Sequence, residues 1–242
     1  MIRLFINQDL SKNKEIIITG KDQHYLYNVM RSRVGGIVVL VNGVDGEWKA
    51  EIAKINKREV ILTIAERLKA FYQPPFLGLV FVPTQKIDLL SKNATELGTT
   101  EFQPIYSEYM YKGKLKLEKI MANIKEAVEQ SERTDFPEVK NIIKLNKFFN
   151  SLDTEDIVLF CEERTGENDA FNVLMSLRNR EVRLDGERKV YVLVGAEGGF
   201  SNQEKIDIKK CPNIISLNLG ERILRAETAV SSILSLVQCF LM

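Results

Sequence analysis

The proline pair Pro74-Pro75 divides the chain into two parts with different patterns. Proline fixes φ and lacks an N–H group, so a proline pair continues neither a helix nor a central strand. Before it, short β-branched runs alternate with turn residues. After it, apolar strand-like runs alternate with longer amphipathic segments. The sequence therefore predicts an α/β protein with a boundary near residue 70 and the stretch "AFYQPPFLG" as a linker.

The first 70 residues favour a small β-barrel. Asn42-Gly43 and Asp45-Gly46 are typical of hairpin turns, and one helix is expected over about Lys21 to Arg31. The predicted strands are Arg3 to Ile6, Glu15 to Thr19, Ile37 to Val41, Glu47 to Ile55 and Glu59 to Ile64. Five short strands separated by turns are typical of such barrels.

Residues 71–242 alternate between strands and helices, which indicates a parallel sheet covered on both faces. The predicted strands are Leu77 to Val82, Phe102 to Ser107, Asp156 to Cys161, Val190 to Val194 and Ile214 to Leu219. The predicted helices are Ile87 to Leu97, Leu115 to Arg133, Asp169 to Arg178, Asn202 to Lys210 and Arg225 to Met242. Ligands of such sheets bind beyond the carboxyl ends of the strands. Loops 195–201 and 218–225 are therefore the candidate sites.

Composition narrows the chemistry of the chain. A single histidine, His24, argues against a multi-histidine metal site and against a Ser-His-Asp hydrolase, and no metal is expected. Three cysteines without a C-x-x-C pair favour a reducing cytoplasm. Residues 1–70 hold 12 Lys or Arg and 8 Asp or Glu, which is compatible with nucleic-acid binding. We expect no signal peptide and no membrane span, because the apolar tail of residues 229–242 is too short.

The glycine loop "VGAEGGFSNQE" follows a predicted strand and opens a helix, as phosphate-binding loops do. Its G-x-x-G-G spacing fits neither standard nucleotide fingerprint, and the carboxylate of Glu197 would repel a pyrophosphate. A cationic or zwitterionic ligand with a nucleoside part remains open, and so does a tight turn that binds nothing. Ser201 and Glu204 form a predicted capping box, which places the helix start at this point.

The second loop, "LNLGERILRAETA", offers apolar side chains together with free backbone groups, which suits an adenine ring. Arg222, Arg225 and Glu227 crowd charge at one helix N-terminus. A cation there opposes the helix dipole, and such local conflicts are typical of functional positions. A surface ion pair is the alternative for each arginine.

These two loops together closely resemble the RsmE family of 16S ribosomal RNA uridine-N3 methyltransferases, in the SPOUT superfamily. Three further stretches agree in order: "HYLYNVMRSRVGG" with Asp45-Gly46, "KIDLLSKNATELGTTEFQPIYSE" and "EAVEQSERTDFPEV". The chain departs from the family pattern at Ala196, where proline is usual, at Ala226, where threonine is usual, and at Tyr109, where arginine is common.

The resemblance implies a PUA-like RNA-binding barrel for residues 1–70 and a SPOUT methyltransferase domain with a C-terminal trefoil knot for residues 71–242. It also implies S-adenosylmethionine as cofactor, 16S rRNA of the small ribosomal subunit as partner, a homodimer and a cytoplasmic location. The expected cofactor-binding residues are Leu159, Gly195, Glu197, Gly198, Gly199, Leu217, Leu219, Gly220, Ile223 and Leu224.

The reaction implied by the family needs deprotonation of uridine N3 and stabilisation of the resulting anion. The expected catalytic residues are Arg133, Arg225 and Glu227, with Glu227 as proton acceptor or ribose contact. The expected RNA-binding residues are Arg3, His24, Arg31, Arg33 and Lys86. N3 lies on the Watson–Crick edge, so the base must be unpaired or flipped out.

Three alternatives stay open at this point. One is a non-catalytic RNA-binding relative, and another is a SPOUT enzyme that acts on tRNA or on a ribose 2′-hydroxyl. The third, a phosphate-binding α/β enzyme, is disfavoured by Glu197 and by the missing fingerprints.

Overall fold

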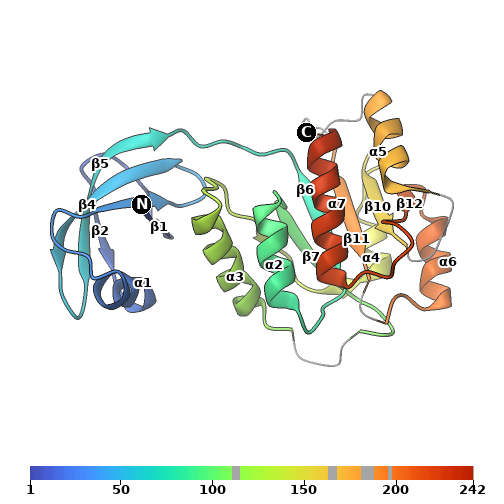
Figure 1. Ribbon diagram of the computed structural model, residues 1–242, viewed down its shortest axis with the longest axis horizontal. Helices are drawn as coiled ribbons and strands as arrows, with labels where there is room; N and C mark the ends of the chain where they lie inside the picture. The colour runs from blue at the N-terminus through green and yellow to red at the C-terminus, as the bar shows by residue number, and fades with distance from the viewer. Residues whose placement is uncertain (111–114, 163–167, 181–187, 196–197, 242) are drawn as a thin grey trace. The chain divides into compact units, whose positions relative to one another are not determined.

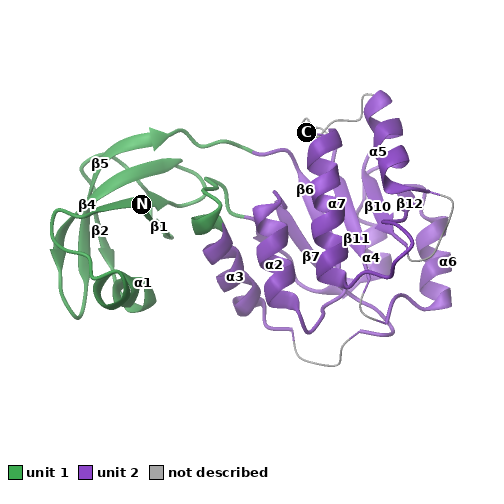
Figure 2. Cartoon of the chain, viewed as in Figure 1, with its two compact units in different colours: residues 1–73, 128–136 green, residues 74–127, 137–242 purple. Residues whose placement is uncertain are grey.

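The computed structural model describes residues 1–110, 115–162, 168–180, 188–195 and 198–241 (Figure 1). Contacts divide the chain into two compact units (Figure 2). The first unit comprises residues 1–73 and 128–136, and the second comprises residues 74–127 and 137–242. The chain thus leaves the first unit at Gln73 and returns to it at residues 128–136. The two units are therefore not two consecutive segments of the chain.

The first unit contains a five-stranded sheet in the order β1-β3-β4-β5-β2. Its strands are β1 (Ile2–Phe5), β2 (Glu15–Ile18), β3 (Ile37–Val41), β4 (Glu47–Ile55) and β5 (Val60–Lys69). β1 pairs with β3 in parallel, and the other pairs are antiparallel. Register shifts along the β4–β5 pair mark irregularities of the bulge type, which bend a sheet. This arrangement agrees with the expected PUA-like fold.

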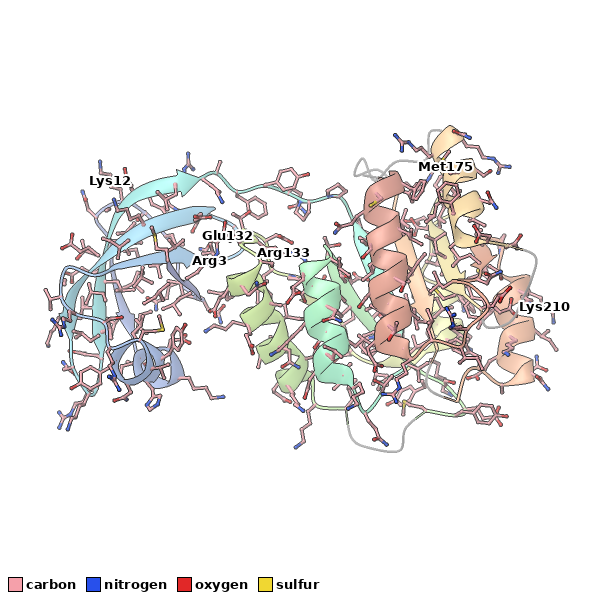
Figure 3. All side chains as sticks on the ribbon, viewed as in Figure 1. Arg3, Lys12, Glu132, Arg133, Met175 and Lys210 are labelled. Carbon is pink, nitrogen blue, oxygen red and sulfur yellow. The ribbon has the colours of Figure 1, made fainter. Side chains whose placement is uncertain are left out.

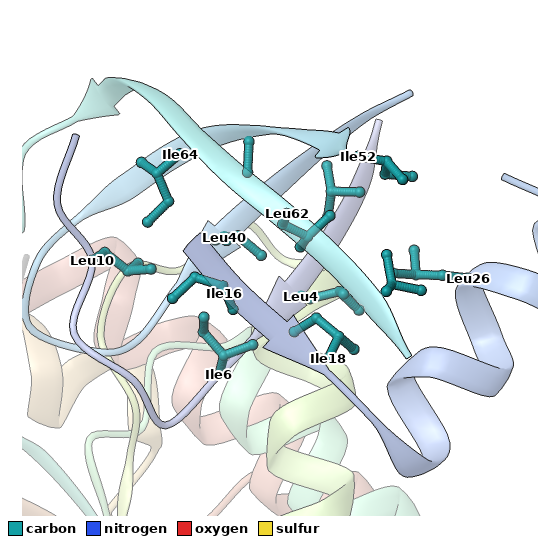
Figure 4. Close-up of a cluster of buried hydrophobic side chains, with 13 residues drawn as sticks. Leu4, Ile6, Leu10, Ile16, Ile18, Leu26, Leu40, Ile52, Leu62 and Ile64 are labelled. Carbon is teal, nitrogen blue, oxygen red and sulfur yellow. The ribbon is translucent and has the colours of Figure 1, made fainter. Parts of the chain in front are cut away.

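Buried aliphatic side chains fill the inside of this sheet (Figure 4). Alternate residues of β2 and β5 point inward, so that Ile16, Leu62 and Ile64 are fully buried. Leu26 closes one end from the helical segment that follows β2, namely α1 (Gly20–His24) and the π-helical turn η1 (Tyr25–Val29). The sequence predicted one helix here and did not reveal its widened last turn.

Residues 128–136 join the first unit through specific contacts. The Glu129 carboxylate accepts a hydrogen bond from the Phe5 N–H at 2.8 Å, and the Phe136 ring packs on Phe5 with 4.3 Å between ring centroids. These partners are more than 120 residues apart in the chain. Sequence periodicity gives no signal for such a long-range pairing. The sequence therefore predicted a helix over Leu115 to Arg133 without these contacts.

The second unit is built on a parallel sheet in the order β12-β10-β11-β6-β7-β8, with β9 also paired to β7. The strands are β6 (Leu77–Phe81), β7 (Glu101–Tyr106), β8 (Glu138–Val139), β9 (Ile143–Lys144), β10 (Ile157–Cys161), β11 (Val190–Val194) and β12 (Ile214–Leu217). Within the described residues these strands pair in parallel, as the alternation of elements predicted. β8 and β9 were not predicted, because two residues are too few to show a period.

Helices cover both faces of this sheet. The second unit contains α2 (Ile87–Glu96), α3 (Leu117–Gln130, whose last turn lies in the first unit), α4 (Leu145–Phe149), α5 (Ala170–Asn179), α6 (Asn202–Lys210) and α7 (Ala226–Leu241). α7 packs against α2, α5 and β11. Phe148 of α4 and Ile208 of α6 belong to a separate buried cluster with Val158 and Leu193.

The C-terminal segment returns across the sheet. β12 lies beside β10 at one end of the strand order, and β10 and β11 separate it from β6, yet the helix that follows β12 packs against β11 and α2. Asn218 forms a parallel bridge with Asp169, so the end of β12 lies against the chain that enters α5. The expected C-terminal trefoil knot stays a prediction.

The turn at Asp45-Gly46 is fixed by two interactions. The Leu10 N–H donates to the Asp45 carboxylate at 2.8 Å, which, together with a bond from the Asn42 amide, lowers the pKa of that carboxyl group. Gly46 has a φ of +85°, and a Cβ there would lie 2.3 Å from the Lys69 carbonyl oxygen. Only glycine fits this position.

We expect Gly46→Ala to lower the free energy of unfolding by more than about 2 kcal/mol, because it adds a backbone clash to the strain of a left-handed conformation. Gly20 also has a positive φ, +65°, but a Cβ there meets nothing within 4 Å. Gly20→Ala is therefore the matched control, with an expected loss of about 1 kcal/mol. Urea unfolding of both variants measures the difference, and equal losses would contradict the clash.

Candidate active site

A cavity of about 460 Å³ lies at the carboxyl ends of three neighbouring strands, β10, β11 and β12. β10 pairs with both of the others in parallel, so all three strands end at the same edge. The chain segments that follow these strands form the walls. The lining residues are Phe160, Cys161, Glu162, Val194, Gly195, Gly199, Phe200, Lys205, Leu219, Gly220, Arg222, Ile223, Leu224, Arg225, Ala226 and Ala229.

The glycine loop forms the wall after β11. Its backbone turns at Gly199, where φ is +67° and a Cβ would meet nothing within 4 Å. The Phe200 ring folds back over Gly195, since a Cβ on Gly195 would lie 3.1 Å from that ring. Phe200 is buried and packs edge-on against Phe160, with 5.7 Å between ring centroids. Two aromatic side chains therefore fix one apolar side of the cavity.

The loop after β12 forms the opposite wall. The Gly220 N–H donates to the Asn218 side chain at 3.1 Å, and Gly220 has a φ of +109°. Ile223 is half-exposed at 55%, and Leu224 adds apolar surface beside it. The loop thus presents backbone groups and aliphatic side chains, a combination that suits a flat heteroaromatic ring.

The charged side chains that line the cavity are mostly cationic. Lys205, Arg222 and Arg225 contribute three positive charges. Glu162 is the one carboxylate that the described lining contains, and its side chain is 6% exposed. Lys209 of α6 lies 2.8 Å from that carboxylate and offsets the cost of its burial.

Cys161 also lines the cavity. Burial raises the pKa of its thiol to about 12, so the thiol stays protonated near neutral pH. The described residues contain no group of three or more His, Cys, Asp or Glu side chains that could hold a metal ion.

Glu227 lies next to the cavity, in the first turn of α7. The residue is 7% exposed, and its Oε2 atom has no hydrogen-bond partner among the described residues. An orphaned buried carboxylate oxygen is costly, and native proteins keep such a group mainly where it serves a function or meets a ligand. Glu227 does not itself line the cavity as described.

Most of the residues predicted to bind a cofactor fall on this cavity. The lining includes Gly195, Gly199, Leu219, Gly220, Ile223 and Leu224, and also Arg225, which was predicted to be catalytic. Leu159 and Leu217 are fully buried and do not line it. Gly198 lies outside the lining, against Tyr109. Glu197 and Ala196 fall outside the described residues, so the structure does not address them.

The prediction missed Phe160, Glu162 and Lys205. Phe160 and Glu162 lie at the end of β10, and the rule that ligands bind beyond strand ends applied to this strand as well. The sequence did not single out the end of β10 as a candidate site, because no glycine follows this strand directly. Lys205 lies on the first turn of α6, within a segment that sequence reasoning treated only as a helix start.

Arg133 lies in the first unit (Figure 3). Its guanidinium group binds the Asp135 carboxylate, with Nε at 3.0 Å from Oδ1 and a second, shorter contact to Oδ2. Arg3 is also held. It donates to the Arg133 carbonyl oxygen at 3.1 Å and pairs with Glu47 at 2.8 Å, with its side chain only 7% exposed. The contacts with substrate that the sequence predicted for these two arginines stay predictions.

The other predicted RNA-binding residues are exposed. The His24 ring lies 2.8 Å from the Asn28 side-chain amide, and Arg31 and Arg33 follow it on the first unit. Lys86 is exposed just before α2 in the second unit. None of the described helices is long and apolar enough to cross a membrane.

Comparison with known proteins agrees with the fold. A family model described as an RNA methyltransferase domain matches residues 73–238, and one described as an RNA methyltransferase PUA domain matches residues 18–65. The ribosomal RNA small subunit methyltransferase E of Rickettsia conorii is 30% identical over 98% of this chain and 94% of its own length. The enzyme of the same name from Aquifex aeolicus is 32% identical over 82% of this chain and 85% of its own length.

The solved structures show the same fold. A ribosomal RNA small subunit methyltransferase E from Neisseria gonorrhoeae, bound to S-adenosyl methionine, matches with a TM-score of 0.84 over 99% of this chain and 97% of that one, at 23% identity. The first and second units correspond to the PUA domain and the methyltransferase domain of the two matching family models. The chain belongs to the RNA methyltransferase family that includes ribosomal RNA small subunit methyltransferase E.

Proposed function

We propose that this protein is an S-adenosylmethionine-dependent methyltransferase that modifies N3 of a specific uridine in 16S ribosomal RNA of the small subunit. The observation that carries the proposal is the cavity between the two loops, in a chain whose relatives are named ribosomal RNA small subunit methyltransferases over almost its whole length. The proposed setting is the cytoplasm, and the proposed assembly is a homodimer.

The cavity fits S-adenosylmethionine in size and in chemistry. About 460 Å³ lies within the range of pockets that hold small ligands. Leu219, Ile223 and Leu224 supply an apolar wall for an adenine ring, and neighbouring backbone groups can bond its edge. The cations Lys205, Arg222 and Arg225 can hold a carboxylate, and Glu162 can accept from hydroxyl or ammonium groups.

Bound in this cavity, S-adenosylmethionine supplies a methyl group on a positively charged sulfur. Uridine N3 carries a proton and becomes a good nucleophile only when that proton leaves. An acceptor in this chain would therefore have to take the N3 proton before N3 could receive the methyl group, with the neutral thioether as leaving group. Glu227 is the proposed acceptor, or a ribose contact, and its orphaned buried oxygen supports either role.

Arg225 is the proposed electrostatic catalyst. It lines the cavity at the entrance to α7, where its guanidinium group opposes the positive end of the helix dipole. Negative charge on the uracil oxygens would offset that conflict. Such preorganised donors stabilise developing anions. We do not assign this electrostatic role to Arg133, because its guanidinium group is paired with the Asp135 carboxylate.

The first unit is proposed to hold the RNA. The exposed His24 lies on its helical segment, and the exposed Arg31 and Arg33 follow the end of that segment. Exposed arginines can bind phosphates without reading sequence. Lys86 is the proposed phosphate contact on the second unit. Arg3 does not carry the proposal, since Glu47 holds it in a buried pair.

We expect the purified protein to transfer a labelled methyl group from S-adenosylmethionine to 16S rRNA and to yield 3-methyluridine on nucleoside digestion. Arg225→Ala should lower the turnover rate about 100- to 1,000-fold, as removal of one anion-stabilising donor does. Lys210→Ala, an exposed cation at the end of α6, is the control and should leave turnover unchanged. Retained turnover in Arg225→Ala would refute the role of this arginine.

We expect Arg31→Ala with Arg33→Ala to weaken RNA binding about equally for all sequences and to lower the slope of log affinity against log salt by about 2, one for each lost phosphate contact. Binding of S-adenosylmethionine should not change. The measurement is filter binding of 16S rRNA over a range of salt concentrations. An unchanged slope would remove these two arginines from the RNA-binding surface.

A further inference from the structure

The glutamate that caps α6 also binds a second loop. Within the cap, the Glu204 Oε2 atom accepts the Ser201 N–H at 2.8 Å, and the Ser201 hydroxyl accepts the Glu204 N–H at 3.3 Å. The same carboxylate accepts the Ser107 hydroxyl at 3.2 Å and the Glu108 N–H at 2.9 Å. Ser107 and Glu108 follow β7, almost one hundred residues earlier in the chain.

A cap does not require these additional bonds. A capping box uses one carboxylate oxygen for the N-cap N–H and is complete within four residues. Both carboxylate oxygens of Glu204 accept hydrogen bonds, and two of the three donors belong to another loop. The loop after β7 and the glycine loop after β11 are therefore joined by one charged side chain.

The β7 loop touches the glycine loop at a second point. A Cβ on Gly198 would lie 3.0 Å from the Tyr109 Cβ, so these two residues pack closely. Between the two points of attachment lie Gly199 and Phe200, which line the cavity. Gly199 has a positive φ, and glycine is the least restricted residue of the backbone. Without bonds to another loop, the backbone at Gly199 and Phe200 would be free to adopt several conformations, and the shape of this cavity wall would vary with it.

We propose that Glu204 is a positioning residue, which uses Ser107 and Glu108 to hold Phe200 and the glycine loop in the form that binds the cofactor. The inference rests on the proposed function, because it assigns the cavity to S-adenosylmethionine. Glu204 does not line that cavity and acts on the ligand only through the loop. Loss of the anchor leaves the cavity's own side chains in place and adds the cost of ordering the loop to each binding event.

Ser107 separates positioning from capping. Ser107→Ala removes the hydroxyl that bonds Glu204 but leaves the capping box intact, whereas Ser107→Thr keeps the hydroxyl. We expect Ser107→Ala to weaken S-adenosylmethionine binding about three- to tenfold, the range that corresponds to one hydrogen bond. Ser107→Thr should bind like the unaltered protein. Isothermal titration of the full chain with S-adenosylmethionine measures each dissociation constant.

Glu204→Gln probes the full set of bonds. Whichever way the amide is turned, its NH₂ group faces either the Ser201 N–H or the Glu108 N–H, and one backbone donor loses its acceptor. We expect binding to weaken about tenfold or more. Gln203→Ala, which removes only the exposed bond to Asp207 on the same helix, is the matched control and should bind normally.

Hydrogen exchange gives a readout that needs no ligand. Amides of residues 198–201 should exchange faster in Ser107→Ala than in Ser107→Thr, while the urea midpoints of both stay equal to that of the unaltered protein. Equal affinity and equal exchange in Ser107→Ala and the unaltered protein would overturn the positioning role. Absence of S-adenosylmethionine binding by the unaltered protein would instead contradict the proposed function, and the inference with it.

Discussion

The parallel pairing of β10 with both β11 and β12 is the constraint on which the site depends. Parallel strands end at the same edge, so three loops that are distant in sequence meet there. β12 is the last strand of the chain but hydrogen-bonds to β10, on the side away from β11. The chain must therefore cross back before α7, and the crossing segment becomes a wall of the cavity.

The walls of the cavity combine packed aromatic side chains with glycines in unusual backbone conformations. Phe160 and Phe200 hold one side through ring contact, while Gly199 and Gly220 adopt conformations that other residues rarely reach. Three cations and a buried, paired glutamate provide the charge. A zwitterionic ligand with a nucleoside part needs this mixture, and a pyrophosphate does not. The glycine loop alone left open whether it binds such a ligand or is a tight turn that binds nothing, and the apolar opposite wall favours the ligand.

The fold was largely predictable because its signals are local. Alternation of apolar runs and amphipathic segments predicted β6, β7, β10, β11 and β12 with the helices between them, and Ser201 with Glu204 marked the start of α6. The capping box is present as predicted. The two-residue strands β8 and β9 and the short helix α4 were missed, since elements of this length complete no hydrophobic period.

The site was predictable only in part, because burial and pairing are tertiary properties. Glycines and apolar residues after β11 and β12 were found from the strand-end rule. Arg3 pairs with Glu47, which is 44 positions away, and nothing in the sequence distinguishes it from the exposed Arg31. Leu159 is apolar, as many pocket residues are, but its side chain points to the face of the sheet opposite Phe160. Successive side chains of a strand point to opposite faces.

Methyl transfer to a ribosomal uridine is tested most directly by mass mapping of modified nucleosides in RNA from cells with and without this protein. We predict that 16S rRNA loses 3-methyluridine at one position when the protein is absent, while the modifications of transfer RNA stay the same. An unchanged 16S rRNA, together with a methyl group lost from transfer RNA or from a ribose 2′-hydroxyl, would contradict the proposed function.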